Sequence, residues 1–171
     1  MSKEGKRTII LDSSAIINGY NPASTTGNRH IITEKAVEEI IGERARNRLQ
    51  MAVELKKTEI TKPKEEEIKK IKEEALKTGD LKYLSKADIE TLAAALEVKE
   101  NGDKPIIMTD DFTIQNLAEY LGIRYTSIAT MGIKRRIEWK TYCQACGRTF
   151  KNPKLKRCPI CGTPLKRKPN V

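Results

Sequence analysis

The four cysteines of this 171-residue chain form two matched pairs, and each pair is followed by a glycine. Cys143 and Cys146 make the first Cys-x-x-Cys-Gly corner, and Cys158 and Cys161 make the second. Two thiolates from each corner complete a tetrahedral Zn²⁺ site. A redox dithiol is the alternative, but two matched pairs exceed what it needs. Four thiolates close the coordination shell, so we expect one structural zinc with no catalytic role.

Two aspartates lie just beyond short apolar runs, where a helical pattern begins. Residues 8–11 lead directly into Asp12, and residues 106–108 lead through one threonine to Asp110. Runs this short and apolar are typical of strands buried on both faces in a parallel sheet. Because ligands bind at the carboxyl ends of such strands, Asp12 and Asp110 are predicted to share the ligand-binding edge.

Two other acids lie on predicted helices. Asp88 stands in a first turn opened by Ser85, and Glu39 follows the helix start at Thr33, next to its competitor Glu38. Ordinary explanations exist: a capping box for Asp88, a helix cap for Asp12 and a surface position for Glu39. Asp111 is expected to cap the helix after it, and it is also a candidate outer-shell acid.

The remaining residue types limit the chemistry to these acids. The single histidine, His30, lies near the start of a strand and has no evident Ser/His or Cys/His partner for covalent catalysis. Clustered carboxylates raise one another's pKa, and Mg²⁺ or Mn²⁺, which prefer oxygen ligands, would neutralise them. Such ions activate water and stabilise the leaving oxygen of a phosphodiester.

Strands and helices alternate along the first 126 residues. Strands are predicted at 8–11, 30–33, 106–108 and 123–126, with helices from about 34 and over 63–76, 85–101 and 112–121. Residues 51–55 are expected to form an edge strand. Alternation of this kind predicts parallel crossovers and a three-layer α/β/α sandwich. We expect this domain over residues 1–130, a basic connector over 131–139, a zinc ribbon over 140–165 and a basic tail over 166–171.

The charge balance favours a polyanionic partner. The chain has 33 Lys and Arg against 23 Asp and Glu, a formal net charge of +10. Such an excess is typical of nucleic-acid binding, although a heat-adapted or merely solubilising surface is the alternative. Aromatic residues make up only 5% of the chain, which argues against broad stacking platforms for bases. Three aromatic residues near the cysteines could stack on unpaired bases: Trp139, Tyr142 and Phe150. Phe150 could equally fill the ribbon core. The candidate RNA contacts near the cysteines are Lys134, Arg135, Arg136, Arg148, Lys151, Lys154, Lys156 and Arg157.

The chain is expected to be cytoplasmic. No apolar run approaches the ~20 residues that cross a bilayer, and the basic start is not followed by a signal-peptide core. Four cysteines in a reducing compartment indicate metal binding rather than disulfides.

Four acid-containing segments resemble the motifs of PIN-domain ribonucleases. They are Ile-Ile-Leu-Asp12, Val-Glu-Glu39-Ile, Leu-Ser-Lys-Ala-Asp88 and Met-Thr-Asp110-Asp111-Phe. Together with residues 77–88 and 110–117 and the zinc ribbon, they make the chain similar to the Nin-one-binding protein family. That family's larger eukaryotic members carry insertions this chain lacks, which fits an archaeal form.

The resemblance implies a metal-dependent endoribonuclease that cuts precursor small-subunit ribosomal RNA at its 3′ end. By motif match, Asp12, Glu39, Asp88 and Asp110 inherit the catalytic site, with Glu39 preferred over Glu38 because it precedes apolar Ile40. Asp12, Asp88 and Asp110, with Asp111 outside them, would hold Mn²⁺ or Mg²⁺. Hydrolysis by water leaves a 3′-hydroxyl and a 5′-phosphate. The implied partners are the immature small ribosomal subunit and a KH-domain assembly factor.

Two alternatives remain open at this stage. One is a non-catalytic RNA-binding assembly factor with a vestigial acidic pocket. The other is a toxin-type PIN ribonuclease, against which the zinc ribbon and residues 77–88 argue.

Overall fold

The computed structural model describes residues 7–128, 139–150 and 155–169. The chain divides into two compact units, Met1–Gly132 and Ile133–Val171, which are described separately here. The finer boundaries expected at 130, 139 and 165 stay predictions.

A five-stranded parallel sheet forms the centre of the first unit. Its strands are β1 (Arg7–Leu11), β2 (Asn28–Thr33), β3 (Thr58–Thr61), β4 (Ile106–Met108) and β5 (Arg124–Thr126), in the order β3-β2-β1-β4-β5. All four pairings are parallel. The strand order reverses between β1 and β4, and this reversal marks the ligand-binding crevice of open α/β sheets. The predicted parallel sheet is therefore confirmed.

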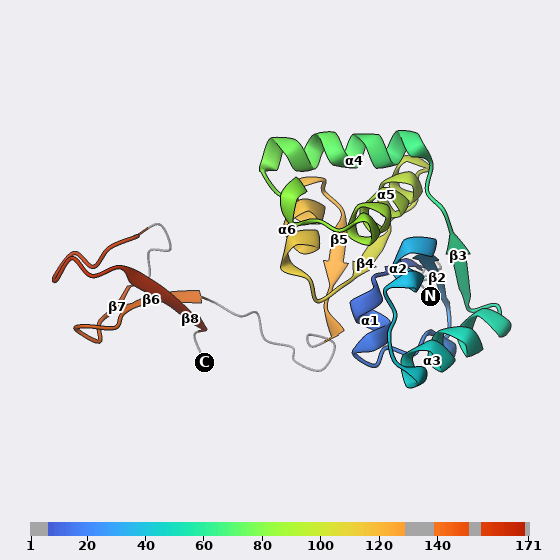
Figure 1. Ribbon diagram of the computed structural model, residues 1–171, viewed down its shortest axis with the longest axis horizontal. Helices are drawn as coiled ribbons and strands as arrows, with labels where there is room; N and C mark the ends of the chain where they lie inside the picture. Colours follow the sequence, from blue (N-terminus) through green and yellow to red (C-terminus); the bar gives the residue numbers. More distant parts are fainter. Residues whose placement is uncertain (1–6, 129–138, 151–154, 170–171) are drawn as a thin grey trace, which may run out of the picture. The chain divides into compact units, whose positions relative to one another are not determined.

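Helices cover both faces of this sheet (Figure 1). Successive residues of β1 point to opposite faces, so Ile10 joins one hydrophobic cluster while Ile9 and Leu11 join the other. The Ile10 cluster draws on α4 (Glu65–Thr78), α5 (Lys86–Glu100) and α6 (Phe112–Tyr120). The second cluster draws on α1 (Ser13–Ile17), α2 (Glu34–Glu38) and α3 (Glu43–Glu54). The three-layer prediction is confirmed, and two short 3-10 helices complete the unit, η1 (Pro22–Ser24) and η2 (Leu81–Tyr83).

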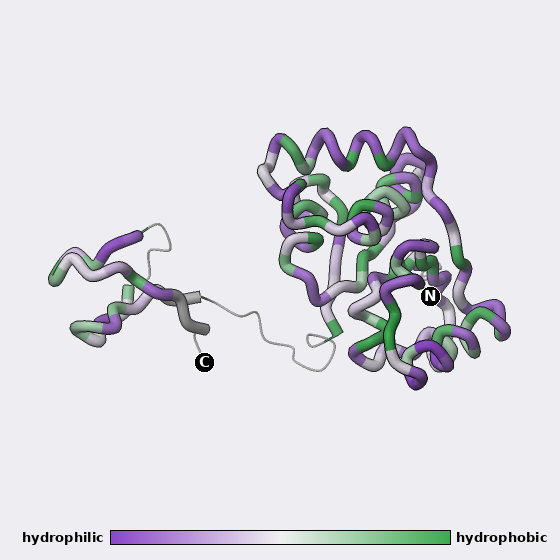
Figure 2. The backbone as a smooth tube through the Cα atoms, in the orientation of Figure 1, coloured by the Kyte–Doolittle hydropathy of each residue, from purple (hydrophilic) through white to green (hydrophobic). Residues whose placement is uncertain are grey.

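The outermost long helix shows how the sequence pattern fixes this packing. Hydrophobic and hydrophilic residues alternate along α4 in Figure 2, and its buried apolar residues are Ile68, Ile71 and Ala75. This spacing of three to four residues places them on one face of the helix. Most of the remaining positions are exposed Lys and Glu, although Glu67 is buried and pairs with Lys70.

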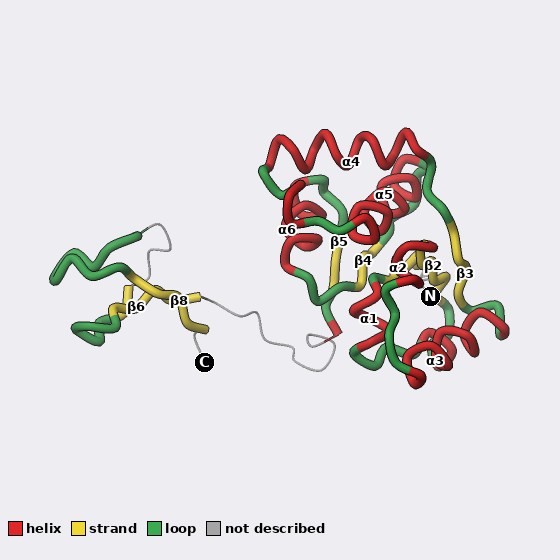
Figure 3. The backbone as a smooth tube through the Cα atoms, viewed as in Figure 1, coloured by secondary structure: helices red, strands yellow, loops and turns green. Residues whose placement is uncertain are grey.

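The edge strand predicted at residues 51–55 is wrong. Met51–Glu54 is the last turn of α3, and the edge strand is β3, four residues later (Figure 3). Ala45, Leu49 and Ala52 are buried at the spacing of a helix face, a pattern that a five-residue window cannot distinguish from a strand. The helix ends where Lys56 adopts a left-handed φ of 54°.

The helix predicted from residue 34 is interrupted at Gly42. Gly42 has φ 90°, a value that side-chain-bearing residues rarely adopt, and it separates α2 from α3. Glu39 is consequently the C-terminal cap of α2 rather than an interior helical residue. This break places Glu39 at the end of its helix.

The second unit is a three-stranded antiparallel sheet, in the order β7-β6-β8. Its strands are β6 (Trp139–Cys143), β7 (Thr149–Phe150) and β8 (Leu165–Pro169). Each Cys-x-x-Cys pair ends in a glycine with φ 71°, Gly147 or Gly162, whose amide donates to the carbonyl of the first cysteine of the pair at 2.9 Å. The two corners therefore have the same backbone geometry. Within the described residues, no helix is long and apolar enough to cross a membrane.

Candidate functional site

Asp12 is the buried centre of a hydrogen-bonded network at the carboxyl edge of the sheet. It follows β1 and caps α1, accepting from the Ser13 amide at 2.8 Å. Its Oδ2 accepts from the hydroxyls of Ser14 at 2.5 Å and Thr109 at 2.8 Å. The Asp12 amide donates to the Met108 carbonyl at 3.1 Å, which ties it to the end of β4. The predicted capping role is confirmed, and the side chain also faces the segment that carries Asp110.

The backbone of Asp110 is linked to the Asp12 carboxylate through one hydroxyl. The Asp110 amide donates to Ser14 Oγ at 3.2 Å, and that hydroxyl donates to Asp12. The two carboxylate oxygens of Asp110 accept from Asn18 Nδ2 at 2.7 Å and from the Ile128 amide at 3.0 Å. Two acids that are 98 positions apart in sequence therefore meet at one edge of the sheet.

Two serines connect Glu39 and Asp88 to this group. Glu39 accepts from Ser13 Oγ at 3.1 Å and from Ser85 Oγ at 3.0 Å. Ser85 and Asp88 form the predicted capping box, in which the Ser85 amide donates to Asp88 Oδ2 at 2.6 Å. Both glutamates, Glu38 and Glu39, are exposed, as the surface alternative for Glu39 had it, but Glu38 pairs with Lys35 Nζ at 2.8 Å. Of the two glutamates, Glu39 is the one linked to the network.

Asp111 caps α6, as predicted. Its Oδ1 accepts from the amides of Thr113 at 2.6 Å and Ile114 at 3.3 Å. Its own amide donates to Thr109 Oγ1 at 3.0 Å, and Thr109 in turn donates to Asp12. Asp111 is therefore connected to the network through its backbone amide, while its carboxylate caps the N-terminus of α6.

The acids repel one another. Burial is the largest cause that raises the pKa of Asp88, and the charges of Asp12 and Asp111 raise it further against the hydrogen bonds from Ser85. A divalent cation at this edge would relieve that repulsion. The available donors are carboxylate and hydroxyl oxygens, the ligand types that Mg²⁺ and Mn²⁺ prefer, so the chemistry of the donor set suits such an ion.

Hydroxyl and backbone amide groups link these acids. Among the residues that the structure describes, only the four cysteines form a group of three or more His, Cys, Asp or Glu side chains close enough to hold a metal ion directly. The sequence did not identify five linking residues as members of the site: Ser13, Ser14, Asn18, Ser85 and Thr109. The available signal was the placement of hydroxyl residues beside the acids, in Asp12-Ser-Ser and Thr-Asp110.

Asp88→Asn is expected to raise the melting temperature by about 1–3 °C in buffer without added Mg²⁺ or Mn²⁺. Asparagine can still accept from the Ser85 amide but carries no charge for Asp12 and Asp111 to repel. A raised folded-state pKa means that ionisation destabilises the fold. The gain should therefore be full above the folded-state pKa of Asp88 and vanish below its unfolded value. Thermal unfolding followed by circular dichroism at neutral and acidic pH measures this, and a lower melting temperature at neutral pH would contradict it.

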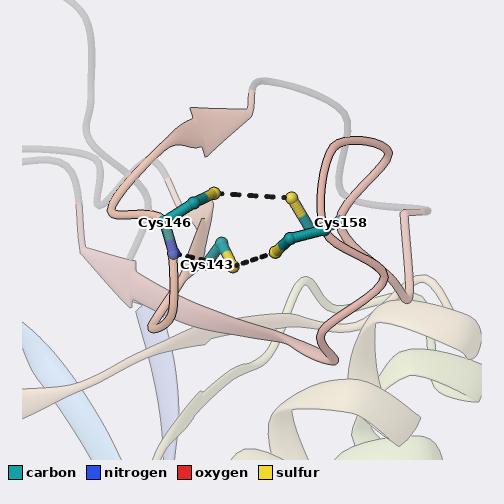
Figure 4. A group of neighbouring side chains, drawn as sticks. Cys143, Cys146 and Cys158 are labelled. Carbon is teal, nitrogen blue, oxygen red and sulfur yellow. Dashed lines mark hydrogen bonds between the residues drawn. The ribbon is translucent and has the colours of Figure 1, made fainter.

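The four thiols of the second unit converge on one point (Figure 4). Cys146 Sγ lies 3.6 Å from Cys158 Sγ, and Cys143 Sγ lies 3.4 Å from Cys161 Sγ. All four sulfurs lie within 4.8 Å of one another. A tetrahedron of sulfurs around Zn²⁺ has edges of about 3.8 Å, whereas a disulfide would need about 2.05 Å. The four-cysteine cluster therefore fits zinc.

Cys146 and Cys161 differ in acidity because their hydrogen-bond partners differ. Hydrogen bonds with Thr163, first through its side chain and then through its backbone, lower the pKa of Cys161 to about 6. A backbone hydrogen bond with Arg148 lowers the pKa of Cys146, but burial and contacts with the other three thiols outweigh it and raise the pKa to about 11. Four close thiolates need a cation to coexist, as a zinc site requires.

The candidate RNA contacts are only partly described. Arg148, Lys156 and Arg157 are exposed in the second unit, and Arg157 also donates to the Gly162 carbonyl at 3.3 Å. The remaining five candidates lie outside the described residues: Lys134, Arg135, Arg136, Lys151 and Lys154. In the first unit, two arginines of α3 contact neighbouring segments, because Arg46 donates to the Ile40 carbonyl at 3.1 Å and Arg48 donates to that of Ile16.

Comparison with known proteins finds relatives that match nearly the whole chain. The family described as PIN domain of ribonuclease matches residues 9–98. Endoribonuclease Nob1 of Pyrococcus abyssi is 36% identical over 162 residues, covering 94% of this chain and 93% of that protein. Endoribonuclease Nob1 of Methanothermobacter thermautotrophicus is 34% identical over 160 residues, covering 93% and 91%. Ribonuclease VapC1 of Thermoplasma acidophilum is 35% identical over 162 residues, covering 92% of this chain and 76% of the relative.

Proposed function

We propose, because the chain belongs to the Nob1 family of PIN-domain endoribonucleases, that it cuts precursor small-subunit ribosomal RNA at its 3′ end during ribosome biogenesis. The observation that carries this proposal is the similarity to Nob1 proteins over more than nine-tenths of both chains, cysteine segment included. The immature small ribosomal subunit is the proposed setting, with a KH-domain assembly factor as a possible partner.

The proposed catalytic site is the network around Asp12. Asp12, Asp88 and Asp110 would hold Mg²⁺ or Mn²⁺, with Asp111 outside them. When bound, such an ion would supply positive charge that lowers the pKa of water and offsets the negative charge of the phosphodiester. Glu39, held by the hydroxyls of Ser13 and Ser85, either completes the ligand set or orients the attacking water.

The protein's own hydrogen bonds prepare these acids for their roles. Each oxygen of Asp110 has a fixed donor, so its carboxylate keeps one orientation before substrate binds. Asp12 is buried and bonded to three neighbours, which holds it in the same way. Preorganised groups of this kind avoid reorganisation during the reaction. Because water is the nucleophile, the products should carry a 3′-hydroxyl and a 5′-phosphate.

The basic surfaces would bind the phosphate backbone. The exposed Arg148, Lys156 and Arg157 of the ribbon and the arginines of α3 are proposed to position the RNA without reading its sequence. One structural zinc at the four cysteines would maintain the ribbon that carries part of this surface.

The purified chain is expected to cut an RNA spanning a small-subunit 3′ junction when Mn²⁺ is added, at one dominant site. Mapping both product ends by primer extension and by ligation that requires a 5′-phosphate measures the site and the end chemistry. A matched RNA whose flanking sequence is scrambled serves as the control. Binding without metal-dependent cutting would favour the non-catalytic assembly factor instead.

A toxin-type ribonuclease is the second candidate, favoured by the 35% identity to VapC1. In that case, overexpression should arrest translation through cleavage of RNAs other than the small-subunit precursor. Sequencing of RNA 5′ ends after induction separates the two functions.

A further inference from the structure

Phe112 is a large apolar side chain exposed at the edge of the acidic network. It opens α6 directly after Asp111 and is 77% exposed, whereas Ile114, Leu117 and Ala118 of the same helix are buried. A phenyl ring in water contributes little to folding, because the hydrophobic effect requires removal of surface from water. Packing within the described part of the first unit therefore does not account for this residue.

The backbone around Phe112 is tied to the acids. Asp111 accepts from the amides of Thr113 and Ile114, which fixes the first turn of α6. The Asp111 amide donates to Thr109 Oγ1, and Thr109 donates to Asp12. Two hydrogen bonds therefore link the residue before Phe112 to the buried centre of the site.

Two more exposed apolar residues neighbour other members of the network in sequence. Ile17 is 42% exposed and precedes Asn18, the partner of Asp110. Ile41 is 70% exposed and stands two positions after Glu39. A substrate for this edge must offer negative charge to a cation and apolar surface to these side chains. Unpaired RNA has both, in its phosphates and in the faces of its bases.

The other exposed aromatic rings of the first unit are less suited to this role. Lys82 Nζ lies 4.7 Å above the ring centre of Tyr83 and so occupies its face. Tyr125 is hydrogen-bonded to Glu119. Tyr120 stands at the opposite end of α6, about 12 Å from Phe112 at 1.5 Å per residue.

We propose that Phe112 is a substrate-positioning residue that stacks on an unpaired base beside the phosphodiester held at the acidic network. This inference rests on the proposed ribonuclease function and specifies how that site recognises single-stranded RNA. Stacking on one aromatic side chain is sequence-tolerant, because every base has a π-face. Phe112 thereby sets which nucleotide lies next to the cut.

The test compares Phe112→Ala, Phe112→Trp and the control Tyr120→Ala on a short junction RNA with Mn²⁺. We expect Phe112→Ala to lower kcat/KM about 10-fold or more, mainly through KM. Phe112→Trp should stay close to wild type, and Tyr120→Ala should not differ from it. An abasic nucleotide at the stacked position should slow wild type to the level of Phe112→Ala and leave that variant unaffected.

Binding gives a second readout that does not depend on cutting. The RNA for this measurement carries 2-aminopurine at the stacked position. Binding of wild type should quench the fluorescence of this base, and binding of Phe112→Ala should quench it less. Three results would overturn the inference. They are full activity of Phe112→Ala, a loss of activity in Phe112→Trp equal to that in Phe112→Ala, and a difference between Phe112→Ala and wild type that persists on every abasic RNA. If wild type cuts no RNA with Mn²⁺, the proposed function fails instead.

Discussion

Asp110→Asn is expected to cut RNA at least about 100-fold more slowly than wild type while binding it equally well. Asparagine has nearly the same shape but lacks the negative charge needed to hold a divalent cation. A contribution of several kcal/mol from such an ion corresponds to a loss of this size. Single-turnover cleavage with excess protein measures the rate, and fluorescence anisotropy of labelled RNA measures binding.

Asp110 is a better choice for this experiment than Asp12. Asp12 is 3% exposed and accepts from three neighbouring residues, so its replacement would also disturb the fold. Asp110 is only half-buried, and an asparagine there can keep one of the two hydrogen bonds that it accepts. The variant should therefore fold normally, which circular dichroism can check.

Asp103→Asn is the matched control. Asp103 is exposed and precedes β4, whereas Asp110 follows β4, so the same chemical change is made at opposite ends of one strand. The control should cut RNA at the wild-type rate. If separately purified Asp110→Asn also cut at the wild-type rate, the acidic network would not be the catalytic site.

Cys158→Ser is expected to reduce bound zinc from one equivalent to about none and to unfold the second unit. Cys158 is buried, and its sulfur faces Cys146. Zinc contributes an apparent ~10–16 kcal/mol at neutral pH to small domains of this kind. The second unit spans fewer than 40 residues, the size below which a metal or disulfide is usually needed. Metal analysis and loss of amide dispersion for β6 and β8 in NMR spectra measure the effect.

Ile160→Ala provides the comparison for this variant. Ile160 lies between the two cysteines of the second corner and is 58% exposed, so its truncation leaves all four ligands in place. That variant should keep one zinc. The first unit should keep its melting temperature in both variants, because its core is separate. A Cys158→Ser protein with one tightly bound zinc and unchanged β6 and β8 would refute the structural-zinc assignment.

The features predicted well from sequence are those set by local patterns. Short apolar runs before Asp12 and Asp110 correctly predicted β1 and β4. The pairing of Ser85 with Asp88 correctly predicted a capping box. The spacing of the cysteines was enough to predict their cluster, because each corner is a local turn. The strand prediction for residues 51–55 was wrong because the apolar pattern of a helix face and that of a strand are indistinguishable over five positions.

The features that could not be predicted depend on contacts between distant segments. Ser13 meets Glu39 only because the fold brings the C-terminal end of α2 to the N-terminal end of α1. Asn18 meets Asp110 only because β1 and β4 are neighbours in the sheet. A hydroxyl or amide residue beside an acid is too common in sequences to identify such a network in advance.

The pairing of β1 with β4 has a consequence for synthesis on the ribosome. Ile9 of β1 pairs with Ile106 of β4. During synthesis, almost a hundred further residues must therefore be added before β1 can pair with β4, one of its two neighbours in the sheet. A nascent chain can pair β1 with β2 early, but contacts of such high contact order form late. The carboxylates can therefore assemble only after most of the first unit has left the exit tunnel, and an incompletely translated chain would be unable to act on the RNA around it.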